Sequence, residues 1–104
     1  KEISKFMKKY TVRAKVWKYP GFAGWHFVSV HKKHSKELKE KYRKPRRGWG
    51  SIPVLITIGK SIWKTSIFPD TKSGAYLLPL KAEVRKKEHI KRDDTIKFLL
   101  QIRP

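Results

Sequence analysis

Residues 77–100, LLPLKAEVRKKEHIKRDDTIKFLL, form a short unit with three parts. An apolar run ends near a proline, a basic segment follows, and two aspartates precede a second apolar run. Short apolar runs bounded by turn residues are typical of strands, whereas the basic segment has the apolar spacing of a short helix. This unit therefore predicts a β-rich fold in which a short helix connects two strands.

The rest of the chain has the same character. FMKKYTVRAKVWK (6–18) alternates, with Tyr10, Val12, Ala14 and Val16 on one face, and this pattern predicts a half-buried strand. Further strands are expected at 25–30, 51–58, 61–68, 75–80 and 95–102, the last with Ile96, Phe98, Leu100 and Ile102 on one face. Gly59 and Lys60 are expected to form a hairpin turn, and helices are expected at 34–42 and 81–90. Ser35 is expected as the N-cap of the first helix, and Ala82, Val84 and Ile90 are expected to point inward from the second.

The fold class predicted from these elements is mainly β. We expect a single domain, a small closed six-stranded double-split-type β-barrel with two short helices. Its two halves, about 6–58 and 61–102, have the same order of strand, strand, helix and strand. We interpret the halves as a pseudo-duplication, with chance self-alignment of a β-rich chain as the alternative.

The alignment of the halves rests on a few positions. A shift of fifty positions lays Val12 on Ile62, Gly24 on Gly74 and Val30 on Leu80. After the helices, a different shift lays Val54, Ile56 and Ile58 against Phe98, Leu100 and Ile102. Two such halves could close one barrel together and leave few free strand edges.

Two resemblances follow from these motifs. Residues 77–100 resemble the swapped-hairpin element of AbrB-type proteins, which build a double-split barrel from two chains and bind DNA. GWHFVSV, RRGWGSIPVLITIG, WKTSIFP and GAYLLPLKAEVRKKE together resemble a bacterial and archaeal domain-of-unknown-function family of small β-barrels, often joined to a YdeI-like module. The second resemblance implies a fold and carries no catalytic residues.

The turn before the last strand departs from both family patterns. These usually have glycine before the aspartate, where this chain has Asp93 followed by Asp94. Aspartate tolerates the left-handed conformation better than most residues, so the turn is expected to form. Asp94 is expected to close this turn rather than to act in catalysis.

Composition limits the partners and the chemistry. The chain has 104 residues, with 27 Lys plus Arg against 8 Asp plus Glu, a formal net charge of +19 and no cysteine. The charge favours polyanionic partners, with a lysine-rich surface of no specific use as the alternative. The lack of cysteine excludes disulfides and thiolate sites. We expect a cytoplasmic protein without a membrane span, and we favour a monomer. Because the first residue is Lys1 and not methionine, we interpret the N-terminus as trimmed.

Basic side chains gather in three segments. The loop RKPRRGWG (43–50) supplies arginines suited to phosphate. Trp49 beside them is expected in the core, with stacking on a base as the alternative. The second helix and the outer face of the first strand supply the others, although a solvated polar surface is the alternative for each. The candidate nucleic-acid-binding residues are Arg13, Lys15, Arg43, Lys44, Arg46, Arg47, Arg85 and Lys86.

Catalytic and metal sites find little support in the sequence. His31, His34 and Glu37 are spaced three apart, but the surrounding lysines oppose a cation. Thr65 and Ser66 have no evident base, and no phosphate-binding glycine loop is visible. We therefore expect no enzyme, no cofactor and no metal.

The leading functional hypothesis is a non-enzymatic module that binds DNA or RNA through the backbone. The alternative is an accessory protein-interaction domain of a larger protein, such as one fused to a YdeI-like module, on which the basic surface is incidental.

Overall fold

The computed structural model describes residues 9–21, 24–42 and 50–103. Within them lie seven strands and two helices. The strands are β1 (Lys9–Lys15), β2 (Trp17–Lys18), β3 (His26–Ser29), β4 (Ile52–Ile58), β5 (Ser61–Pro69), β6 (Tyr76–Pro79) and β7 (Thr95–Ile102). The helices are α1 (Lys32–Tyr42) and α2 (Ala82–Lys87).

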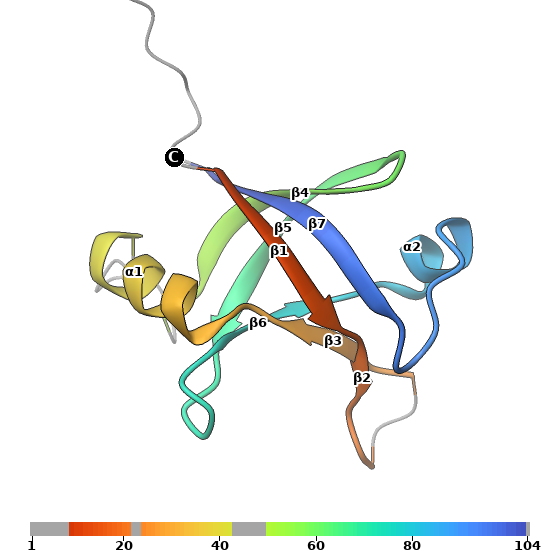
Figure 1. The fold of residues 1–104 in the computed structure, drawn as a ribbon, viewed down its shortest axis with the longest axis horizontal. Helices are drawn as coiled ribbons and strands as arrows, with labels where there is room; N and C mark the ends of the chain where they lie inside the picture. Colours follow the sequence, from red (N-terminus) through yellow and green to blue (C-terminus); the bar gives the residue numbers. More distant parts are fainter. Residues whose placement is uncertain (1–8, 22–23, 43–49, 104) are drawn as a thin grey trace, which may run out of the picture.

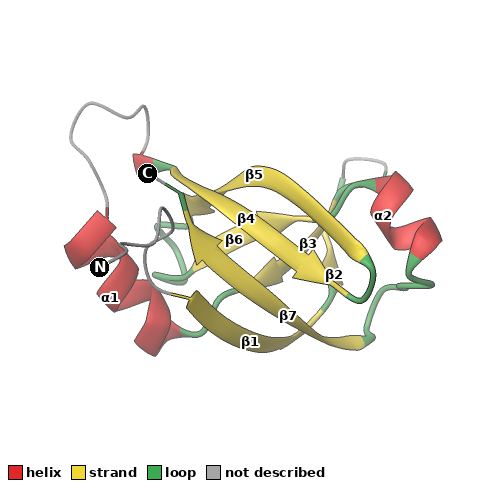
Figure 2. Ribbon diagram, turned by 90° about the horizontal axis from the view of Figure 1, so that it is seen from above, coloured by secondary structure: helices red, strands yellow, loops and turns green. Residues whose placement is uncertain are grey.

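The strands form one antiparallel sheet that curls into a nearly closed barrel (Figure 1). Its order is β1-β7-β4-β5-β6-β3-β2. The two outermost strands, β1 and β2, are separated in sequence only by Val16, so the ends of the sheet come together there. The two helices lie at opposite ends of the barrel (Figure 2). The prediction of a mainly β, barrel-like domain with two short helices is confirmed.

The predicted number of six strands is wrong because the first strand divides at Val16. Lys15 pairs with Thr95 of β7, whereas Trp17 pairs with Phe27 of β3. At the break, the Val16 N–H donates to the Asp94 carbonyl and the Val16 carbonyl accepts from the Asp93 N–H, both at 2.8 Å. A strand that changes neighbours must leave its first ladder. The alternation ends at the same place, because Lys18, which would continue the inner face after Val16, is exposed.

The core fills the barrel with the inward side chains of alternating strand positions. The predicted inner faces of the first and last strands are confirmed, because Val12, Val16 and Leu100 are fully buried and Ala14 and Ile96 pack against them. The fully buried core also includes Val28, Val30, Leu38, Ile52, Val54, Ile56, Ile67 and Leu78.

The position of Ser35 differs from the prediction. α1 begins at Lys32, so Ser35 lies inside the helix and is not its N-cap. Its side chain is 1% exposed; Oγ donates to the Val30 carbonyl at 3.0 Å and accepts from the Tyr76 N–H at 2.9 Å. The serine that looked like a local cap therefore joins α1 to the end of β3 and the start of β6.

α2 and the turn after it largely follow the sequence. Val84 and Ile90 are buried as expected, but Ala82 is exposed. Asp93 adopts a left-handed φ of 75°, and the Asp94 carboxylate accepts from the Lys91 N–H at 2.8 Å. The prediction that these two aspartates form and close the turn is confirmed.

Corresponding strands of the two halves lie beside each other. β3 pairs with β6, and β4 pairs with β7. Val28 pairs with Leu78 and Ile56 pairs with Leu100, and each pair joins aligned positions of the halves. The alignment of Val12 with Ile62 fails, because Val12 is buried whereas Ile62 is 63% exposed. The duplication itself stays a prediction.

We expect Gly59→Ala to lower the free energy of unfolding by about 1–2 kcal/mol, because the left-handed region costs about that much for a residue with a Cβ. Gly59 has φ 55° in the predicted β4–β5 turn, and a Cβ there would overlap the Glu88 carboxylate. That carboxylate is held by a 2.6 Å hydrogen bond from Ser61 Oγ. Urea unfolding measures the loss.

The control for this variant is Gly74→Ala, which has a similar φ of 78° but open space around the new Cβ. Adding Glu88→Ala to Gly59→Ala should recover part of the loss. Equal losses for the two glycine variants would mean that the contact with Glu88 contributes nothing.

Candidate functional site

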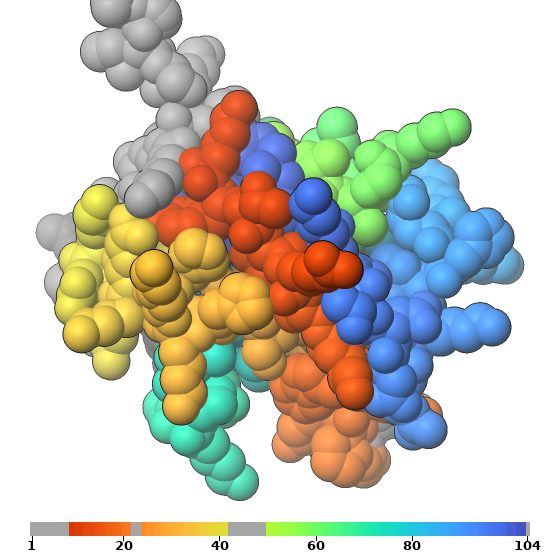
Figure 3. Space-filling model, in the orientation of Figure 1, coloured from red at the N-terminus to blue at the C-terminus, as the bar shows by residue number. Residues whose placement is uncertain are grey.

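The outer sides of β1 and β7 form a basic surface, which we call the β1–β7 face. Figure 3 shows the two strands side by side on one side of the molecule, β1 in red and β7 in blue. Lys9, Arg13, Lys15 and Lys97 are exposed there, and Arg13 lies directly opposite Lys97 in the ladder. The face consists of Lys9, Thr11, Arg13, Lys15, Thr95, Lys97, Leu99 and Gln101.

The charges on this face have no protein counter-ion in the described part of the chain. Like charges directly opposite each other in a ladder are destabilising. The described acidic residues all lie elsewhere, at Glu37, Glu40, Asp70, Glu83, Glu88, Asp93 and Asp94. Neither Arg13 nor Lys97 forms an ion pair with a described residue. Within the described ranges, therefore, no acidic side chain neutralises the positive charge of this face.

Sequence reasoning missed Lys97. The alternation of residues 95–102 would have placed its side chain outward, together with Thr95 and Leu99. Its position opposite Arg13, however, depends on the register between β1 and β7, which are far apart in the chain. No local pattern reports that register.

The predicted binding residues fall into three groups. Arg13 and Lys15 lie on the β1–β7 face, whereas Arg85 and Lys86 lie on α2 at one end of the barrel. The loop residues lie outside the described part of the chain, as does Trp49: they are Arg43, Lys44, Arg46 and Arg47. The structure thus brings two of the eight predicted residues together on the β1–β7 face.

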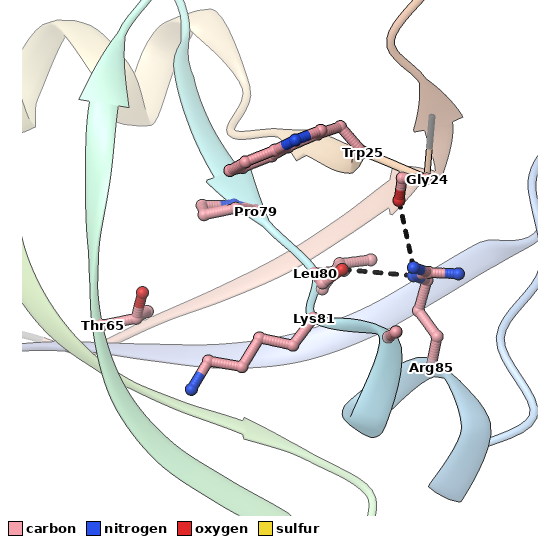
Figure 4. A pocket seen from close by; sticks show the side chains of 8 residues that line it. Gly24, Trp25, Thr65, Pro79, Leu80, Lys81 and Arg85 are labelled. Carbon is pink, nitrogen blue, oxygen red and sulfur yellow. Dashed lines mark hydrogen bonds between the residues drawn. The ribbon is translucent and has the colours of Figure 1, made fainter. Parts of the chain in front are cut away.

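A pocket of about 540 Å³ opens beside α2 (Figure 4). Ligand sites commonly have volumes of this size. The loop before β3, the middle of β5, the end of β6 and the start of α2 each contribute to it. Its lining residues are Gly24, Trp25, Thr65, Pro79, Leu80, Lys81, Ala82 and Arg85. No local sequence pattern indicates the pocket, because the segments that line it are separated along the chain.

Trp25 is an exposed aromatic residue whose ring packs against a second aromatic ring, that of Phe27. Trp25 is 55% exposed. Its ring stacks on the Phe27 ring, with the two centroids 5.8 Å apart and an angle of 21° between the planes. Phe27 is itself packed against Trp17 at 5.1 Å and Tyr19 at 6.3 Å. The indole is therefore held in place while much of its surface remains in contact with solvent.

Arg85 holds the loop that carries Trp25. Its Nη2 donates to the Gly24 carbonyl at 3.1 Å, and its Nε donates to the Leu80 carbonyl at 3.2 Å. His26 Nδ1 lies 2.8 Å from the same Gly24 carbonyl and donates to it in the tautomer with Nδ1 protonated. Arg85, predicted as a phosphate contact, thus has a positioning role in this structure.

The described residues provide neither a metal site nor a membrane-spanning helix. They contain no group of three or more His, Cys, Asp or Glu side chains that could hold a metal ion. None of the helices in this part of the chain is long and apolar enough to cross a membrane.

Residues 13–100 match the family described as "Domain of unknown function (DUF1905)". The match runs from β1 into β7 and spans most of the chain. The chain belongs to the DUF1905 family. The prediction of a domain-of-unknown-function family is thereby confirmed.

The DUF1905 match assigns no activity, but it includes most of the β1–β7 face and the whole pocket. The chain has no significant match among curated proteins or among solved structures. The AbrB-type relation and the fusion to a YdeI-like module stay predictions from the sequence.

Proposed function

We propose that this DUF1905 domain is a non-enzymatic module that binds nucleic acid through its phosphate backbone. The observation that carries the proposal is the pair Arg13–Lys97, two cations directly opposite each other on an exposed face. Such a pair costs stability in the free protein, and an external polyanion would remove that cost.

The surroundings of the pair support the same function. Lys9 and Lys15 extend the positive charge along β1, and no described acidic residue interrupts it. The formal net charge of +19 adds a long-range attraction. The resemblance of residues 77–100 to AbrB-type elements supports DNA as one such ligand.

The proposed contacts are with phosphates, so little sequence discrimination is expected. Phosphate contacts fix the position of a protein on nucleic acid, whereas base edges in the grooves supply the sequence information. The β1–β7 face offers two strands and no recognition helix. Lys and Arg on a sheet surface can neutralise phosphates of either DNA or RNA.

The test is binding of labelled duplex DNA and single-stranded RNA across a salt series. Four cations on the β1–β7 face predict a slope of roughly −3 to −4 in a log–log plot of affinity against salt. Weak binding of both nucleic acids at every salt concentration would contradict the proposal. Binding to heparin with the same affinity would likewise show that the positive charge is not used specifically for nucleic acid.

One observation favours the accessory protein-interaction function as a second candidate. Ile62 and Phe68 are 63% and 40% exposed and lie near the two ends of β5, so each leaves apolar surface open to a protein partner. This alternative, with a fused module or a separate protein as partner, predicts binding that persists in high salt and is lost in Ile62→Ser.

A further inference from the structure

We propose that the pocket beside α2 takes one unpaired base of a single-stranded nucleic acid. Trp25 would stack on the base, and Lys81 would neutralise an adjacent phosphate. This inference rests on the proposed function, and it adds a preference for single strands that the β1–β7 face alone would not give.

The first step is the preorganised aromatic surface. Base–aromatic stacking tolerates any sequence, because every base has a π-face. Trp25 is already oriented by Phe27, and Arg85 fixes the carbonyl that precedes it. A side chain that is ordered before binding loses less conformational freedom when the ligand arrives. The geometry thus favours a flat aromatic ligand at this position.

The second step is the polarity of the pocket. Pro79 lies beneath the Trp25 ring, while Thr65 and the long Lys81 side chain lie on the other side of the opening (Figure 4). Lys81 is exposed and forms no ion pair with a described residue. No carboxylate is among the described lining residues. The Thr65 hydroxyl can donate or accept a hydrogen bond at a base edge.

The third step is the state of the ligand. In a duplex, each base is stacked on both faces and paired along its edge. Bases in single strands can be splayed out and stacked on protein aromatic rings. A pocket that combines one exposed indole with a cation and no carboxylate therefore fits a nucleotide whose base is unpaired.

The experiment compares a labelled oligothymidine with a duplex of the same length, for wild type and for Trp25→Ala. We expect Trp25→Ala to bind the single strand about tenfold more weakly, as for loss of one stacked base. Its duplex affinity should stay within about twofold of wild type. Trp25→Phe should recover most of the single-strand affinity, since it restores an aromatic face.

Two matched controls separate the pocket from the general surface. Phe68→Ala removes an aromatic side chain that is 40% exposed and lies outside the pocket, and it should leave the single-strand affinity unchanged. Lys81→Gln should weaken single-strand binding more than Lys87→Gln, which removes the same charge from an exposed α2 position outside the pocket. Circular dichroism measures whether each variant is folded. If Trp25→Ala is unfolded, Lys81→Gln serves as the test of the pocket.

The outcomes distinguish this inference from the proposed function. The pocket inference would be overturned if wild type bound both probes and neither Trp25→Ala nor Lys81→Gln lost affinity selectively for the single strand. Binding through the phosphate backbone would then remain supported. If thymidine monophosphate bound as tightly as the oligothymidine, the ligand would be a mononucleotide, and its assignment as single-stranded nucleic acid would be overturned. Wild type that binds neither probe at any salt concentration would overturn both proposals.

Discussion

The variant Arg13→Gln/Lys97→Gln is expected to bind nucleic acid roughly 30-fold more weakly than wild type near 0.15 M salt. Each phosphate contact releases counterions with a slope of about 0.9, which corresponds to about fivefold in affinity per contact at that salt concentration. Removing two contacts should also reduce the salt slope by about 2. Fluorescence anisotropy across the salt series measures both quantities.

The same variant has a second readout that a structural role would not produce. Arg13 and Lys97 lie opposite each other without an acidic partner among the described residues, so their neutralisation should raise the free energy of unfolding by a few tenths of a kcal/mol. A binding loss together with unchanged or higher stability would identify the pair as a ligand contact. A binding loss that follows a loss of stability would contradict this role.

The matched control is Lys60→Gln/Lys72→Gln. Both lysines are exposed, and they lie in the turns between β4 and β5 and between β5 and β6, away from the β1–β7 face. This control removes the same net charge, and we expect less than about a threefold loss from long-range attraction alone. Equal losses in the two double variants would show that nucleic acid responds to the total charge and not to the face.

The fold could be predicted where local pattern determines it. Alternation identified the inner faces of β1 and β7, and Gly59 identified the β4–β5 turn. The break at Val16 escaped prediction, although the alternation ends there: Lys18, which stands where the inner face would continue, is exposed. What changes there is the neighbouring strand, from β7 to β3, and that depends on barrel closure.

The candidate sites were less accessible from sequence for a related reason. The outward direction of Arg13 follows from its own strand, but its partner Lys97 follows from a long-range register. The pocket needs Trp25, Thr65 and Lys81 from separate segments to meet around one space. Sequence patterns report which side chains face outward, and tertiary pairing decides which outward side chains become neighbours.

Ser35 shows the same limit within the core. Serine before a helical pattern is a common cap, because its hydroxyl can accept from backbone N–H groups nearby. Here the hydroxyl accepts instead from Tyr76, which is 41 residues away in sequence. In β6, Tyr76 is paired with Pro69, which has no N–H to donate, and the Tyr76 carbonyl accepts instead from the Val30 N–H at 2.8 Å. The serine hydroxyl supplies the acceptor for the Tyr76 N–H at the same end of the ladder.

We expect Ser35→Ala to lower the free energy of unfolding by about 2–4 kcal/mol, as measured by urea unfolding. The substitution leaves the Tyr76 N–H without its acceptor at a residue that is 2% exposed, and a buried donor without a partner costs about 1–3 kcal/mol. It also removes the 3.0 Å hydrogen bond to the Val30 carbonyl, worth about 1 kcal/mol.

The control is Ser73→Ala. Ser73 also makes two hydrogen bonds, to Asp70 Oδ2 at 2.7 Å and from the Ala75 N–H at 3.2 Å, but it is exposed in the β5–β6 turn. Water can replace both partners there, so we expect a loss below about 1 kcal/mol. If Ser35→Ala cost no more than Ser73→Ala, the buried hydroxyl would not be what joins α1 to β3 and β6, and the packing of Leu38 would have to hold the helix at its end of the barrel.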